Sequence, residues 1–352
     1  MHEELTGRSA GLNTPNRFEK LHLEPLEIEL YDSEAKRTVP TVFYRDLSRS
    51  ILARNESPDL SFMYSINPYR GCEHGCIYCY ARPSHEYLGF SAGIDFESKI
   101  MVKLDAAGLL AAEFRKKSWV PQMVALSGNT DCYQPVEQKL ELTRACLGVF
   151  LAFRNPAGIV TKSDLILRDL DILRTMNSMN LVEVVVSITS LDRELSRTME
   201  PRAATPENRL RTIEQLADAG IPVAVNVAPI IPGLTDKEVP RILKAASDAG
   251  ATGAGYQLLR LAGPVQHLFA DWLQRSYPER AGKIENRIRD TRGGKLNDAR
   301  FGLRMRGEGE IARAIDALFE LNARKYQLDG EWHDLNTRAF RRPSSTQPDL
   351  FE

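Results

Sequence analysis

Residues 158–189 read GIVTKSDLILRDLDILRTMNSMNLVEVVVSIT, and this stretch decides the fold class. Its two ends, residues 158–162 and 183–189, are short runs rich in Val and Ile, which is typical of strands buried on both faces of a parallel sheet. Between them, Ser163 is a helix N-cap, and Ile166, Leu170 and Leu173 follow at helical spacing. The stretch therefore predicts a right-handed βαβ unit.

The same alternation continues on both sides of this unit. Thr205-Pro206-Glu207 begins a helix that Gly220 ends, and residues 236–250 repeat the pattern. Further strands are predicted at residues 62–67, 122–127, 222–228 and 253–259. We therefore expect an α/β fold, a partial (β/α)6-type TIM-like barrel of parallel strands with N- and C-terminal extensions.

The sequence divides into four predicted parts. Residues 1–57 form an N-terminal extension with one strand-like stretch at 26–30, and residues 58–262 form the barrel. Residues 263–334 form a helical, basic C-terminal extension, and residues 335–352 form a disordered tail because they are polar and rich in Pro and Ser.

Composition excludes several classes of protein. The chain of 352 residues is 43% hydrophobic and 26% charged, which is typical of a soluble globular protein. No apolar run approaches the ~18 residues that cross a bilayer, and the N-terminus lacks the apolar region of a signal peptide. We expect a cytoplasmic protein without a membrane partner, in which thiols stay reduced. The formal net charge of -1 gives no overall reason for binding nucleic acid.

Polar residues gather at the carboxyl ends of the predicted strands, the edge of a β/α barrel at which active sites are built. Strand ends also become polar simply because they leave the core, but this explains a lysine less well than a Ser or Asn. The residues at this edge are Asn67, Ser127 to Asp131, Thr161 to Ser163, Ser187, Thr189, Ser190, Asn226, Gln257 and Arg260.

Three of the five cysteines lie in residues 67–80, NPYRGCEHGCIYCY. Cys72, Cys76 and Cys79 have the spacing C-x3-C-x2-C, and three thiolates from one loop favour a soft metal. A tetrahedral zinc site would need a fourth ligand such as His74 or a distant cysteine, and buried inert thiols are a further alternative. An iron–sulfur cluster with one iron open to a further ligand explains the spacing better.

This motif, with Tyr78 before its last cysteine, resembles the signature of the radical S-adenosylmethionine superfamily. The resemblance covers about residues 58–262 and implies one [4Fe–4S] cluster, held by the three motif cysteines, whose open iron binds S-adenosylmethionine. It also implies reductive cleavage to a 5′-deoxyadenosyl radical that abstracts hydrogen from a substrate, and an external one-electron reductant such as flavodoxin or ferredoxin.

Further motifs resemble the branch of this superfamily related to spore photoproduct lyase, often described as DNA repair photolyases. They are GNTDCYQPVE at residues 128–137, VTKS at 160–163, EPR at 200–202, and NRFE at 16–19, which fits a bacterial subgroup. The resemblance implies a lyase-type reaction, with a lesion in DNA or RNA as one candidate substrate.

The resemblance also implies roles for residues at the strand ends. Lys162 matches a lysine that meets the methionine carboxylate, and Arg202 either assists a carboxylate or pairs with Glu200. The methionine amino group is contacted by the loop after the second strand, although the usual Gly-Gly-Glu is absent here. Candidates for the amino group are Ser127, Asn129, Thr130 and Asp131; for the ribose, Ser187 and Thr189; and for adenine, the segment from Ile230 to Gly233.

Cys132 and Tyr133 are rival candidates for a hydrogen-atom donor. Spore photoproduct lyase uses a cysteine in the corresponding region, but there it precedes a Thr-Asp pair, whereas Cys132 follows one. The alternative for Cys132 is a buried inert thiol. Because only Cys132 and Cys146 remain outside the motif, we expect a single cluster.

The substrate class stays open at this point. Residues 275–306 contain ten Lys or Arg and four Asp or Glu, which suits either a phosphate-binding groove or a solvated helix face. The candidates are a radical enzyme acting on nucleic acid, a radical enzyme acting on a peptide or small molecule, and a non-catalytic iron–sulfur or zinc protein.

Overall fold

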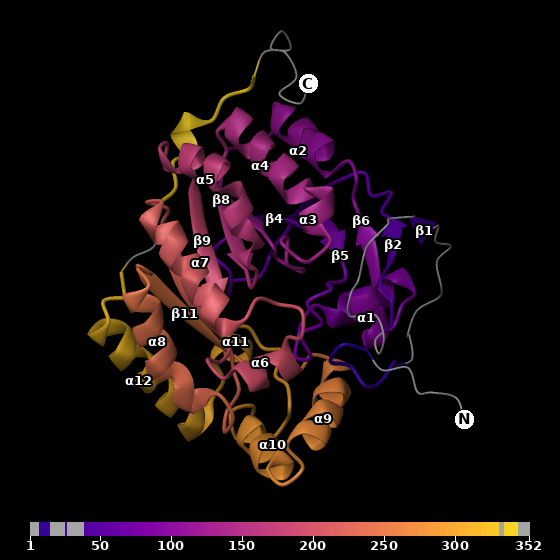
Figure 1. Cartoon of the computed structure of the whole chain (residues 1–352), viewed down its shortest axis with the longest axis vertical. Helices are drawn as coiled ribbons and strands as arrows, with labels where there is room; N and C mark the ends of the chain where they lie inside the picture. The colour runs from indigo at the N-terminus through magenta and orange to yellow at the C-terminus, as the bar shows by residue number, and fades with distance from the viewer. Residues whose placement is uncertain (1–6, 15–24, 27–38, 331–333, 344–352) are drawn as a thin grey trace.

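A seven-stranded sheet, in the order β11-β10-β9-β8-β7-β4-β3, forms the centre of the molecule (Figure 1). The computed structural model describes residues 7–14, 25–26, 39–330 and 334–343. Within this sheet, each strand from β4 to β11 is parallel to its neighbours in that part of the order. Only the edge strand β3 (Leu52–Arg54) pairs antiparallel, with β4. The partial parallel barrel predicted from the sequence is confirmed. Its parallel strands are β4 (Tyr64–Ile66), β7 (Val124–Leu126), β8 (Ala157–Thr161), β9 (Val182–Ser187), β10 (Val223–Ile230) and β11 (Gly253–Leu258).

Helices connect these strands along the outside of the sheet (Figure 1). Thr205 caps α7, the second helix after β9, by accepting a hydrogen bond from Asn208 N at 3.3 Å, as its sequence predicts. Ser163 also acts as a cap, but the turn that it begins is a 3-10 helix, Asp164–Asp169, which leads into α5. The connecting helices are α2 (Ala106–Arg115), α3 (Glu137–Leu140), α4 (Leu142–Phe153), α5 (Leu170–Asn177), α6 (Arg193–Met199), α7 (Pro206–Asp218) and α8 (Val239–Asp248), the last preceded by a 3-10 turn at Asp236–Glu238.

A second, four-stranded sheet lies beside the barrel, in the order β1-β2-β6-β5. Because β2 and β3 both precede residue 58, the N-terminal extension contributes strands to both sheets and is not a separate part. Residues 27–30 and 16–19 lie outside the described residues. The elements are β1 (Pro25–Leu26), β2 (Val42–Arg45), β5 (Tyr69–Arg70), β6 (Lys99–Val102), the 3-10 helix Arg82–Leu88 and α1 (Ile94–Ser98).

The residues that follow the barrel form helices and pack on it. Phe269 and Trp272 are buried in an apolar cluster beneath α9 (Val265–Ser276) and α10 (Ala281–Asp290). Two further helices follow, α11 (Leu303–Arg306) and α12 (Gly309–Lys325), and α12 lies beside α8 (Figure 1). None of the helices among the described residues combines the length and apolar character needed to span a bilayer.

The expectation of a disordered tail from residue 335 is wrong for residues 335–343. Phe340 stacks edge-on against Phe114, with ring centroids 6.4 Å apart. The backbone N–H groups of Asn336 and Arg341 donate to carbonyls of the barrel at 2.8 Å. One aromatic anchor and these backbone bonds are enough to order a polar segment, although its composition alone predicts disorder. Residues 344–352 lie outside the described residues.

Glu183 gives a test of the packing at the amino-terminal end of β9. Burial raises its pKa to about 6 from 4.5, so the folded protein binds the proton more tightly than the unfolded chain does. Stability therefore decreases as the pH rises from about 4.5 to about 6, by roughly 1 kcal/mol after allowance for solvent screening.

We predict that Glu183→Gln increases the free energy of unfolding by roughly 1 kcal/mol at pH 8 and leaves it unchanged near pH 4. Urea unfolding at both pH values measures the difference. Glu214→Gln, an exposed change of the same kind on α7, should have no effect at either pH. An equal gain for Glu183→Gln at both pH values would contradict the prediction.

Candidate active site

A cavity of about 240 Å³ opens at the carboxyl ends of the parallel strands, where the sequence predicts the active site. A larger cavity of about 560 Å³ lies at the amino ends of β9, β10 and β11, away from the predicted site residues. The predicted site residues that line the smaller cavity are Cys72, Cys76, Cys79, Ser127, Asn129, Thr130, Asp131, Lys162 and Ser187.

The three motif cysteines reach this cavity because their loop is tightly folded. Gly71 has φ +79°, and a Cβ on it would lie 2.9 Å from the carbonyl oxygen of Phe96. That carbonyl accepts a hydrogen bond of 2.9 Å from Cys72 N. A residue with a side chain would therefore push the first cysteine away from α1.

The donor set fits an iron–sulfur cluster better than a single ion. Burial raises the pKa of the Cys72, Cys76 and Cys79 thiols, so their thiolates need a bound cation to be stable here. Among the described residues, no three His, Cys, Asp or Glu side chains are arranged to hold one metal ion. In a [4Fe–4S] cluster each iron takes one thiolate, so three separated thiols around a cavity suit three of its four irons.

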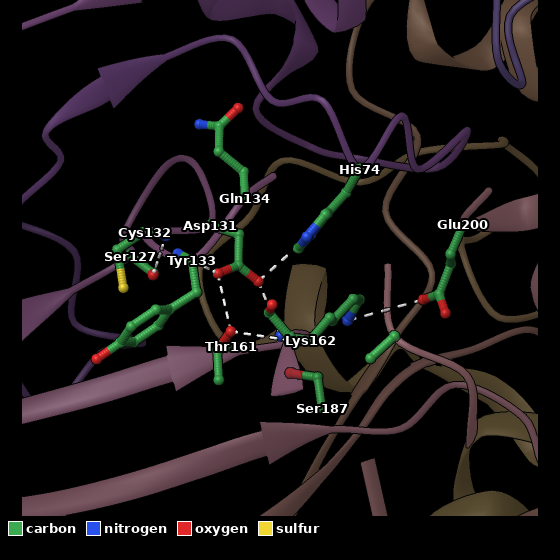
Figure 2. Close-up of polar contacts among 12 residues, drawn as sticks. His74, Ser127, Asp131, Cys132, Tyr133, Gln134, Thr161, Lys162, Ser187 and Glu200 are labelled. Atoms are coloured by element: carbon green, nitrogen blue, oxygen red, sulfur yellow. Dashed lines mark hydrogen bonds and ion pairs between the residues drawn. The ribbon is translucent and has the colours of Figure 1, made fainter. Parts of the chain in front are cut away.

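His74, the proposed fourth zinc ligand, lines the same cavity as the cysteines. Its Nδ1 lies 3.5 Å from Asp131 Oδ2, and burial lowers its pKa to about 4 (Figure 2). Because no three His, Cys, Asp or Glu side chains of the described residues are placed to share one ion, the zinc alternative gains no support from the geometry.

Arg82 holds the cysteine loop in place from behind. Its guanidinium is fully buried and donates to the carbonyls of Cys76 and Gly75, both at 3.0 Å, and to Gly93 O at 2.8 Å. It also forms an ion pair of 2.7 Å with Glu97, which is equally buried. One side chain thus joins the loop to α1, and losing either partner would leave a buried charge without compensation.

The N-terminal segment 7–14 packs on the outside of the same loop. Ser9 Oγ donates to the carbonyl of Gly75, and Ala10 is buried beside Cys76 and Ile77. Nothing in the local sequence predicts this contact, because it joins positions more than sixty residues apart.

Asp131 connects the loop after β7 to the end of β8. Its carboxylate accepts hydrogen bonds of 2.8 Å from Thr161 Oγ1 and from Lys162 N (Figure 2). It also accepts one of 2.9 Å from Tyr133 N. With these donors, Asp131 orients the backbone that carries Lys162.

Ser127 begins this loop in a conformation that favours glycine, with φ +74°. Its hydroxyl accepts a hydrogen bond of 2.9 Å from Cys132 N. Asn67 Oδ1 accepts from the backbone N–H groups of Asn129 and Thr130 at 2.9 and 3.1 Å. The loop is therefore fixed by side-chain-to-backbone bonds, so that its cavity-facing residues are held without a ligand.

Lys162 extends into the cavity next to a buried carboxylate. Its Nζ donates to Ala228 O at 3.2 Å and lies 3.9 Å from Glu200 Oε1 (Figure 2). Burial, followed by repulsion from Arg209, lowers the pKa of Lys162 to about 8. An incoming carboxylate would restore much of the solvation that this ammonium loses.

Glu200 is the centre of a buried network that sequence reasoning largely missed. It accepts hydrogen bonds from Tyr78 Oη, from Thr189 Oγ1 at 2.8 Å, and from Arg209. The sequence marks Glu200 only as part of the EPR motif and as a candidate partner of Arg202, and Arg209 lies within α7 with no pattern to mark it. The network links the cysteine loop to β9 and α7.

Several predicted site residues do not line the cavity. Thr189 donates to Glu200 and to Ala228 O instead. The predicted alternative that Arg202 pairs with Glu200 is wrong, because Arg202 Nη1 donates to Glu73 Oε1 at 2.9 Å. The adenine candidates Ile230 and Gly233 are also absent from the residues that line the cavity.

The two candidate hydrogen-atom donors are also not at the cavity. Cys132 and Tyr133 have no exposed surface and belong to the main apolar core. Tyr133 Oη donates to Asp169 at 3.1 Å, and Figure 2 shows both side chains extending away from His74 and Lys162. The bonds from Cys132 N to Ser127 and from Tyr133 N to Asp131 turn this part of the loop toward the core. The donor role predicted from the sequence therefore has no geometric support in this structure.

Comparison with known proteins agrees with the geometry. An uncharacterized protein of Mycobacterium tuberculosis is 40% identical over 242 residues, which cover 67% of this chain and 71% of that protein. An uncharacterized protein of Methanocaldococcus jannaschii is 29% identical over 224 residues, covering 64% and 80%.

Among solved structures, spore photoproduct lyase complexed with dinucleoside spore photoproduct has a similar fold. Its TM-score is 0.59 at 18% identity, over 81% of this chain and 79% of that chain. The family model described as the radical SAM superfamily matches residues 66–246, just over half of the chain. Together with the three thiols that face one cavity, this match shows that the chain belongs to the radical SAM superfamily, which uses a [4Fe–4S] cluster and S-adenosylmethionine.

Proposed function

We propose that this protein is a radical enzyme of the lyase type that abstracts hydrogen from a nucleic-acid substrate. The observation that carries the proposal is that the three motif thiols and the Lys162 ammonium face a single cavity. When bound, the cluster and S-adenosylmethionine supply a 5′-deoxyadenosyl radical, with one electron from an external reductant such as flavodoxin or ferredoxin.

Within this proposal, Lys162 binds the methionine carboxylate. The carbonyl of Ala228 and the carboxylate of Glu200 hold the ammonium at the cavity wall. Only 16% of the Lys162 side chain is exposed, so a charge-assisted bond to a carboxylate would form with little competition from water. Asp131 and Glu200 act as positioning residues, one for the backbone of Lys162 and the other for its amine.

The mouth of the cavity supports a nucleic-acid substrate. Tyr80 and Phe62 line it, and Tyr80 is 46% exposed. Exposed aromatic rings at the entrance of a site can stack on unpaired bases. The fold that this chain shares with spore photoproduct lyase, a protein solved with a dinucleoside, is consistent with such a substrate.

The basic stretch at 275–306 adds less support. Arg275, Arg287, Arg300 and Arg304 all form ion pairs with nearby carboxylates. A solvated and internally paired surface therefore accounts for much of its charge, and a phosphate groove along this stretch is not needed for the proposal.

We predict that Cys76→Ala lowers the iron content after anaerobic reconstitution and decreases 5′-deoxyadenosine formation at least about 100-fold, because one thiolate ligand is lost. Iron and sulfide assays and chromatography of the nucleoside measure both quantities. Cys146→Ala, a change of the same kind in the core of α4, should keep both. A Cys76→Ala protein that retained full cleavage would contradict the assignment.

We predict that Lys162→Met weakens the binding of S-adenosylmethionine about tenfold or more while the iron content stays unchanged, because one charge-assisted bond is lost. Anaerobic equilibrium dialysis with the labelled cofactor gives the affinity. The exposed Lys237→Met serves as the matched control and should bind normally. Equal affinity for Lys162→Met and the wild type would remove this role.

The substrate class is tested with S-adenosylmethionine deuterated at the 5′ carbon and with ultraviolet-irradiated single-stranded DNA. We expect salt-sensitive binding of the DNA and exchange of deuterium with the damaged strand. Cleavage of the cofactor without any DNA binding at low salt would instead favour the alternative, a peptide or small-molecule substrate. Failure to cleave the cofactor would favour a non-catalytic iron–sulfur protein.

A further inference from the structure

Arg260 is a cation at the cavity wall with no strong acceptor of its own. It follows β11 and lines the same cavity as the motif cysteines. Its Nε is enclosed and has no hydrogen-bond partner in the described part of the chain. The one acceptor that it reaches there is the thioether of Met305, 3.7 Å from Nη1, and a thioether accepts only weak hydrogen bonds.

Two other arginines increase the positive charge around Arg260. Burial and then repulsion from Arg304 lower the pKa of Arg260, and burial, with a smaller repulsion from Arg260, lowers the pKa of Arg292. Arg304 is already paired with Asp59, and Arg292 donates to the carbonyls of Leu259 and Leu303. Across the described residues, Arg304 alone of these three arginines has a carboxylate within ion-pair distance, although Asp59 also attracts Arg260 and Asp298 attracts Arg292. The group therefore has an excess of positive charge that an anion in the cavity would neutralise.

An aromatic ring lies beside this guanidinium. The central carbon of Arg260 lies 5.5 Å from the ring centroid of Tyr80. Tyr80 is held in turn, because its hydroxyl donates to Gly128 O at 2.7 Å. Such stacking leaves the N–H groups in the plane of an arginine available for a two-pronged bond to an anion.

Three neutral polar side chains lie on the strands between Lys162 and Arg260. Asn226 on β10 is in register with Ser187 on β9, and Gln257 lies on β11, the next strand. All three line the cavity, and none of their side chains makes a hydrogen bond within the described ranges. Amides and hydroxyls of this kind both donate and accept, as the edges of a base require.

We propose that Arg260 is a second anion-binding residue of this cavity, beside Lys162, and takes a phosphate group of the substrate, with Tyr80 and the polar row Ser187, Asn226 and Gln257 facing the attached nucleoside. This inference rests on the proposed function and extends it from a class of substrate to the residue that binds the phosphate of that substrate. A carboxylate has the same charge and can make the same two-pronged bond, so the test separates the two anions.

The test uses the anaerobically reconstituted protein and the dinucleotide TpT, compared with TpT whose linkage is an uncharged methylphosphonate. We expect Arg260→Gln to bind TpT about tenfold or more weakly than the wild type, and the wild type to bind the uncharged analogue equally weakly. Arg260→Lys should recover part of the affinity, because it keeps the charge but loses the planar fork. Lys283→Gln, which removes one exposed charge from α10, should bind TpT normally. Equal binding of both dinucleotides by the wild type would overturn the proposal, as would unchanged TpT binding by a folded Arg260→Gln.

A second probe separates this inference from the proposed function. Inorganic phosphate and acetate are titrated into the same proteins and followed by the change in thermal unfolding temperature. If TpT does not bind but phosphate stabilises the wild type and not Arg260→Gln, the anion site stands and the nucleic-acid substrate fails. Two results would overturn the phosphate assignment. One is that acetate stabilises the wild type and phosphate does not. The other is that each anion stabilises Arg260→Gln as much as it stabilises the wild type.

Discussion

The buried guanidinium of Arg82 is the interaction on which the site depends. It binds the backbone of the cysteine loop and the carboxylate of Glu97, so it joins the loop and α1 to the 3-10 helix that carries it. Backbone carbonyls in an apolar interior need donors, and a single arginine supplies several at once. The three thiols are therefore held at the cavity wall by a contact made behind them, with segment 7–14 closing the outer side.

A largely buried lysine and a buried glutamate face each other at another wall of the cavity. Lys162 and Glu200 both lie away from solvent, and burial lowers the pKa of the amine and raises that of the acid. Their closest approach, 3.9 Å, is too long for a hydrogen bond, so the ammonium keeps the capacity to bind a further anion. The same principle applies at Arg260, which burial and repulsion from Arg304 destabilise as a cation. The cavity thus has a cation at each of two places that parallel strands bring to one edge.

In the loop after β7, some residues line the cavity and the residues directly after them are buried in the core. Ser127, Asn129, Thr130 and Asp131 face the cavity, whereas the next two residues, Cys132 and Tyr133, are buried in the core. The backbone bonds to Asp131 and Ser127 make this division. Adjacent residues in a tight loop point in different directions, so proximity in sequence to the predicted site was a poor guide to the donor.

The sequence by itself determined the parallel barrel, the edge that carries the cavity, and the three thiols and the lysine, Lys162, that line it. Periodicity, strand-end polarity and a short cysteine motif are local patterns, and each depends on residues close together in the chain. Only the tertiary structure decided the partners of Glu200 and Arg202, the burial of Cys132, and the packing of segment 7–14 and of Phe340. Those contacts join residues far apart in the chain, and their energies depend on burial, which no local pattern encodes.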